Sequence, residues 1–235
     1  MSAVASSTTA RLPELVRRVV DRNVPVGRLN RSGVRFTQVG DMQLKPGRWL
    51  SFRAEQEMAF DRVDFAWRAD FRAAPLVSLR VHDWYHAGAG GLVARLFGLV
   101  PVVRASGAAV ARGEAMRYLA ELAWAPQALV LNNALEWREV DESTVEVATL
   151  VGREHVAVML HFDSAGDIVG ASTEARPRMV GKQAIDTPWS GVFGEYREID
   201  GVRIPTTAEV SWLLADGPFT YFRCTVTAWS ARDGG

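Results

Sequence analysis

The sequence has few of the features that mark secreted, membrane-spanning or nucleic-acid-binding proteins. Its 235 residues include one cysteine, Cys224, so no intrachain disulfide can form and nothing indicates an oxidising compartment. No apolar run reaches 18 residues, which predicts no membrane-spanning helix, and the first 22 residues lack the apolar core of a signal peptide. We therefore expect a soluble cytoplasmic protein, unless a targeting segment has been removed.

An excess of charge of one sign is also missing. The chain has 27 Lys plus Arg and 27 Asp plus Glu residues, which gives a formal net charge of zero. Nucleic acids and anionic membranes both select basic surfaces, so we expect neither as a partner. The oligomeric state cannot be predicted from these features.

Standard catalytic and cofactor motifs are absent as well. The sequence contains no G-x-S-x-G, and the GAGG segment at 88–91 is not followed by Gly-Lys-Ser/Thr. His82 and His86 are four residues apart, but they lie in a predicted strand and lack a third metal ligand nearby. We expect no metal and no other cofactor.

What the sequence does contain is a long series of strand patterns. In VDFAWRADFR, alternate residues from Val63 to Phe71 are apolar and most of the residues between them are charged, which is typical of a half-buried antiparallel strand. Asp-Gly pairs at 200–201 and 216–217 separate alternating runs and predict hairpins. Strands are predicted over 34–105 and 135–230, around a helical insertion over 107–131.

These patterns predict a mainly β fold of the α+β class, in one domain over residues 1–235. A meander of this length twists and curls, so we expect a barrel or half-barrel with helices on its concave side. The N-terminal arm, residues 1–30, includes a short helix over 10–22, with Thr8 or Thr9 as its N-cap.

The segment RGEAMRYLAELAW, residues 112–124, reads as an amphipathic helix. Its polar arc contains Glu114, Arg117, Tyr118, Glu121 and Trp124, which are neighbours on one face. If the arc faces solvent, it is an ordinary surface with weak ion pairs. If it faces a cavity, Glu114 or Glu121 has a raised pKa and can act as a general acid or base beside Arg117 and Tyr118.

Eight tryptophans and several charged residues in otherwise apolar strands offer candidates for a binding site. The tryptophans fit either a large aromatic core or the walls of a pocket. The charged residues, Asp83, Arg95, Arg104 and Arg223, face either outward or into a barrel as anchors. The predicted ligand-binding residues are Trp67, Arg104, Trp124, Trp189, Trp212, Tyr221 and Arg223.

Three functions fit these features. The first is the binding of an apolar small molecule or lipid in an aromatic-lined barrel cavity. The second is a cofactor-free isomerase, cyclase, lyase or hydrolase that uses a helix carboxylate in the same cavity. The third is a structural or interaction module without a cavity, in which the helix faces solvent.

Several segments resemble a bacterial family of unknown function that is common in actinobacteria. They are RASG, RGEAMRYLAELAW followed by AP, and TPWSGVFGEYREIDGVRIPTTAEVSWLLADGPFTYFR, and the similarity runs from about Phe36 to the end. The curled antiparallel sheet also looks like the fold of bacterial lipoprotein carriers, an analogy at the level of fold alone. Many relatives begin with a hydrophobic anchoring segment, which this chain lacks. The family implies no catalytic residues, but it implies recurring positions at Arg104, Glu114, Arg117, Tyr118, Trp124, Pro126, Trp189 and Trp212.

Overall fold

The chain forms one highly curled antiparallel sheet with a helix inside the curl. A computed structural model describes residues 12–233, apart from residues 26, 28, 75, 76 and 182. Thirteen strands are joined in the order β6-β5-β4-β3-β2-β1-β13-β12-β11-β10-β9-β8-β7. The predicted mainly β fold, a curled antiparallel meander with a short N-terminal helix and a central helical insertion, is confirmed. The sheet does not close, because β6 and β7 are its two edges.

The first series of strands is β1 (Arg31–Lys45), β2 (Arg48–Ala59), β3 (Phe65–Ala74), β4 (Val77–His86), β5 (Ala89–Leu96) and β6 (Val100–Ser106). The second series is β7 (Glu136–Asp141), β8 (Thr144–Val151), β9 (Glu154–Phe162), β10 (Ile168–Val180), β11 (Gln183–Ile199), β12 (Val202–Leu214) and β13 (Gly217–Asp233). The two series are joined by the pairing of β1 with β13, so the beginning and the end of the chain meet in the middle of the sheet.

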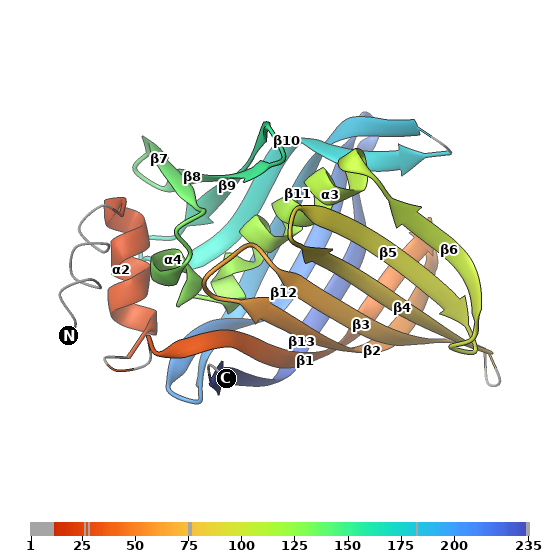
Figure 1. Ribbon diagram of the computed structural model, residues 1–235, viewed down its shortest axis with the longest axis horizontal. Helices are drawn as coiled ribbons and strands as arrows, with labels where there is room; N and C mark the ends of the chain where they lie inside the picture. The colour runs from red at the N-terminus through yellow and green to blue at the C-terminus, as the bar shows by residue number, and fades with distance from the viewer. Residues whose placement is uncertain (1–11, 26, 28, 75–76, 182, 234–235) are drawn as a thin grey trace.

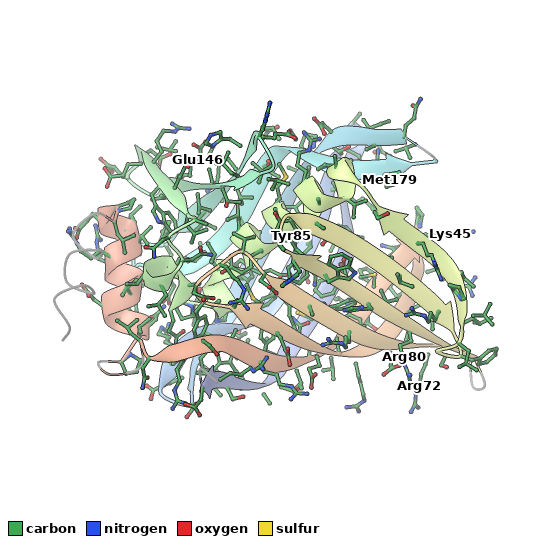
Figure 2. The ribbon with its side chains drawn as sticks, viewed as in Figure 1. Lys45, Arg72, Arg80, Tyr85, Glu146 and Met179 are labelled. Atoms are coloured by element: carbon green, nitrogen blue, oxygen red, sulfur yellow. The ribbon has the colours of Figure 1, made fainter. Side chains whose placement is uncertain are left out.

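Alternation sorts the strand residues between the two faces of the sheet, as the sequence predicts. In β3, Phe65, Trp67, Ala69 and Phe71 are buried, whereas Arg68, Asp70 and Arg72 are exposed. The concave face therefore carries the apolar side chains, and Arg72 and Arg80 project from the outer face (Figure 2). This division makes the interior of the curl the place to look for a cavity.

The helical segments lie at two places. Helix α2 (Glu14–Asn23) packs against β12 and the short helix α4 (Ala128–Leu131), close to the end of the sheet that carries β7 (Figure 1). It begins after Pro13 without a side-chain cap, and the predicted caps Thr8 and Thr9 lie outside the described residues. Helix α3 (Ala108–Ala120) runs through the curl and continues as a 3-10 turn, η1 (Glu121–Trp124). Among the described helices, none is both long enough and apolar enough to cross a bilayer.

Candidate functional site

A cavity of about 440 Å³ lies between α3 and the concave face of the sheet. This volume falls within the range of small-molecule sites, about 300–1,000 Å³. Val103 on β6 and Met179 on β10 line the cavity and are about half exposed, so they mark its opening beside the first turns of α3 (Figure 2). Its aromatic walls are Trp67, Phe71, Trp124, Trp189, Phe193, Trp212, Tyr221 and Phe222.

The four predicted wall tryptophans share this cavity, together with Tyr221. The indole of Trp212 stacks on Tyr221, with ring centroids 5.7 Å apart and an interplanar angle of 18°. The indole N–H groups of the other three donate to protein acceptors: Gln38 Oε1 at 3.0 Å from Trp67, the Pro205 carbonyl oxygen at 2.9 Å from Trp124 and the Tyr221 hydroxyl at 3.1 Å from Trp189. These rings therefore present apolar surface to the cavity while their polar atoms are satisfied.

A glycine allows α3 to come close to the sheet. A Cβ at Gly90 on β5 would lie 2.8 Å from the Ala111 Cα and 3.2 Å from the Glu114 Cγ. Any larger residue at this position would push the helix away. The close approach brings the polar arc of α3 over the cavity, so the predicted alternative of a solvent-facing helix is wrong.

Arg117 is the best-satisfied charge in the cavity. Its guanidinium pairs with Asp83 and with Glu121, the latter over 2.9 Å from Nε to Oε1, and it donates to Gln56 Oε1 at 3.3 Å. It also lies 5.0 Å from the Phe65 ring centroid. Burial alone would lower the pKa of Arg117, but the carboxylates of Glu121, Asp83 and Glu114 raise it above its usual value. Arg117 therefore stays charged, and its donors are occupied by the protein.

Glu121 is held in the same network. One of its carboxylate oxygens accepts from Arg117, and the other accepts from the Gln56 amide. Because both oxygens are engaged, Glu121 is suited to holding Arg117 in place and not to exchanging a proton with a ligand.

Glu114 and Asp83 form a different kind of contact. Their carboxyl groups are in hydrogen-bonding contact with each other, and Asp83 also pairs with Arg117. Burial, followed by the negative charge of Asp83, raises the pKa of Glu114 well above its ordinary value. Burial also raises the pKa of Asp83, but Arg117 and Arg176 oppose that shift. The pair therefore shares one proton, which resides mainly on Glu114 because Glu114 has no guanidinium bound to it.

Arg176 on β10 completes the polar part of the cavity. Its guanidinium carbon lies 4.8 Å from the Trp189 ring centroid and 6.0 Å from that of Trp212. The positive charge of Arg176 acts to lower the pKa of both Asp83 and Glu114. Among the described residues, however, no carboxylate forms an ion pair with it.

Comparison with known proteins assigns the chain to a family. A model for a family of unknown function, DUF6544, matches residues 2–224. The chain belongs to the DUF6544 family. No curated protein matches it significantly.

Solved structures similar to this DUF6544 chain share little sequence with it. A LolA superfamily protein from Nitrosomonas europaea is 10% identical, with a TM-score of 0.48 over 94% of this chain and 93% of the other. A DUF1329 family protein from Desulfovibrio piger is 12% identical, with a TM-score of 0.46 over 97% of this chain and 92% of the other. A β-barrel-like DUF1849 protein from Brucella abortus is 10% identical, with a TM-score of 0.24 over 87% of this chain and 99% of the other.

Tyr118, predicted as a catalytic or anchoring residue, does not line the cavity of the DUF6544 chain. It is fully buried, donates its hydroxyl proton to the Ala59 carbonyl oxygen at 2.8 Å and accepts from the Asn132 amide at 3.1 Å. On the wheel Tyr118 lies at the edge of the polar arc, and the structure turns that edge toward the end of β2. Its hydroxyl is a structural bond, and its placement corrects the prediction.

Arg104 and Arg223, both predicted as possible anchors, lie on the outer face of the sheet. Arg104 is exposed on edge strand β6, and Arg223 pairs with Asp41 at 3.1 Å and lies over Trp49. Strand alternation decides both orientations: the neighbours of Arg223, Phe222 and Cys224, face inward and are buried.

A bulge explains how Tyr221 still reaches the cavity. The β12–β13 register passes from Val210↔Phe222 to Ser211↔Thr220, so Tyr221 is an extra residue without a partner. Such a bulge interrupts strict alternation, and the two consecutive residues Tyr221 and Phe222 both line the cavity.

Asp83, Gln56 and Arg176 belong to the site but were not predicted as site residues. Asp83 carried a signal, as a charged residue in an otherwise apolar strand. Arg176 follows a register shift in β10, between Thr173↔Trp189 and Arg176↔Thr187, which puts it on the same face as Trp189. Simple alternation from Thr173 would have placed it outside.

The histidines lie apart from this site. His86 is exposed and contacts Asp64 at 2.6 Å, and His82 faces the outer side of β4. The described residues contain no group of three or more His, Cys, Asp or Glu side chains suited to holding a metal ion.

Proposed function

We propose that this protein binds an apolar small molecule or lipid in the cavity under α3. The observation that carries the proposal is a hollow of about 440 Å³ whose walls include four tryptophans and few polar groups. Ligand-binding cavities have this composition, mainly apolar surface with a small number of placed polar groups. The cytoplasmic location and the independence from cofactors stay predictions.

Two neighbouring valines on β6 provide a matched test. Val103 lines the opening of the cavity and Val102 points away from it, while their exposed fractions are similar, 48% and 53%. A tryptophan at either position adds the same bulk to a partly exposed site. We expect Val103→Trp to weaken binding of the uncharged fluorescent probe N-phenyl-1-naphthylamine at least tenfold, and Val102→Trp to leave it unchanged.

Fluorescence titration of the three proteins measures this difference. Equal effects of the two substitutions, or no saturable binding of the probe to the wild-type protein, would contradict the proposal. Circular dichroism of both variants checks that the fold is retained.

A second candidate, cofactor-free acid–base catalysis, is favoured by the shared proton of Asp83 and Glu114. A protonated Glu114 beside an ionised Asp83 offers an acid and a base at one place, as isomerisation or elimination requires. Mass spectrometry of the molecule that co-purifies with the protein separates the two functions. A binding protein returns the molecule unchanged, whereas an enzyme returns an altered one and loses that ability on Glu114→Gln.

A further inference from the structure

The polar groups of the cavity are not equally satisfied by the protein. Arg117 is engaged by Asp83, Glu121 and Gln56. In contrast, Asp83 Oδ1 and Glu114 Oε2 are buried without an N–H or hydroxyl donor among the described residues. The two side chains are 94% and 91% buried, and both line the cavity. A buried polar oxygen without a partner is costly, so these two atoms indicate where a ligand group belongs.

Arg176 supplies the complementary donor. It lines the same cavity, it is only partly buried, and its contacts with Trp189 and Trp212 fix the plane of the guanidinium without using up its N–H groups. A ligand group between Arg176 and the carboxyl pair can accept from the first and donate to the second.

The charge balance restricts what that group can be. The buried acids Asp83, Glu114 and Glu121 and the bases Arg117 and Arg176 balance when the carboxyl pair holds one proton. A carboxylate on the ligand would face Asp83 at close range, and an ammonium would face Arg176. Either charge would be desolvated next to a like charge, whereas a hydroxyl leaves the balance unchanged.

We propose that the ligand carries an uncharged polar end that both donates and accepts hydrogen bonds, an alcohol in the simplest case, bound between Asp83, Glu114 and Arg176. The hydroxyl donates to the free carboxylate oxygen of Asp83 and accepts from Arg176 or from the protonated Glu114. The apolar remainder lies along the tryptophan walls. This inference rests on the proposed function and specifies its ligand class.

Four probes with the same ten-carbon chain test the assignment by displacement of N-phenyl-1-naphthylamine. They are 1-decanol, 1-methoxydecane, decanoate and decylammonium. A purely apolar cavity would favour the ether, which is the less polar of the two uncharged probes. We expect 1-decanol to bind at least tenfold more tightly than 1-methoxydecane, because only the alcohol donates to Asp83, and at least tenfold more tightly than either charged probe.

Two neighbouring arginines on β10 give the matched variants. Arg176→Met should weaken 1-decanol about tenfold and improve decylammonium, because the repelling charge is gone. Arg178 is also partly buried and lies near Trp212, but it does not line the cavity, so Arg178→Met should change neither affinity. Glu114→Gln should keep 1-decanol binding and improve decanoate.

The outcomes separate this inference from the proposed function. If the ether or a charged probe equals 1-decanol, or if Arg178→Met acts like Arg176→Met, the alcohol assignment is overturned while apolar binding stands. If the fluorescent probe fails to bind the wild-type protein, both proposals fall.

Discussion

The two faces of α3 treat buried polar atoms in opposite ways. On the packed face, the Tyr118 hydroxyl has both an acceptor and a donor, and Leu119 and Leu122 beside it are fully buried. On the cavity face, Glu114 is also deeply buried, yet its Oε2 has no partner. The same helix thus borders a filled interior on one side and an unfilled one on the other. An orphaned oxygen is found on the side where the protein leaves space.

The largest expected effect sharpens this contrast through stability. Leu119→Ala removes a side chain with no exposed surface from the packed face, and such substitutions cost about 2–5 kcal/mol. Leu92→Ala removes a partly buried leucine that already borders the cavity, so we expect less than half of that loss. Urea unfolding of both variants measures the difference. Equal losses would mean that the two faces are equally well packed.

A smaller effect concerns the pH dependence of stability. An unfolded glutamate releases its proton near pH 4.5, whereas folded Glu114 keeps it to higher pH. Above pH 4.5 the folded state therefore binds more protons than the unfolded state, and stability falls as the pH rises toward the folded pKa. Glu114→Gln removes this loss, so its Tm advantage over the wild type should grow from pH 5 to pH 8, by about 2–4 °C for each 1 kcal/mol recovered.

Tyr118→Phe is the counterpart on the packed face. It leaves the Asn132 amide and the Ala59 carbonyl each short of a partner, so it should lower the Tm by a similar amount at both pH values. Differential scanning calorimetry records both variants. A Tm difference for Glu114→Gln that does not change with pH would argue against a proton shared with Asp83.

The smallest effect is expected on the outer face. Arg104 is exposed on β6, and we expect Arg104→Ala to change stability by less than about 0.5 kcal/mol and to leave probe binding unchanged. Arg176→Met, inside the curl, is the positive control for binding. A loss of binding on Arg104→Ala would restore the predicted anchor and contradict the placement of the cavity.

The fold was predictable because strand and helix periods are local. Alternation in VDFAWRADFR placed Phe65 and Trp67 inside, and the structure agrees. The helical wheel likewise grouped Glu114, Arg117 and Glu121, which face one cavity. That all 235 residues form one domain stays a prediction, although the thirteen described strands share one sheet.

The partners of these residues were not predictable, because they depend on long-range register. Asp83 meets Arg117 from a strand 34 positions earlier in the chain. The bulges at Tyr221 and before Arg176 reverse the alternation that a sequence pattern assumes, and the pattern contains no sign of either. Tyr118 shows the opposite limit, since a position at the edge of a wheel arc is settled only by packing.

The cavity draws its apolar walls and its polar groups from separate positions. Most of the wall comes from strands at both ends of the chain, whereas the unsatisfied polar atoms belong to Asp83, Glu114 and Arg176 alone. Size selection and end-group selection can therefore evolve independently. Members of the DUF6544 family could accept longer or shorter guests through changes at positions such as Leu92 or Val103 while keeping the same preference for the guest's polar end.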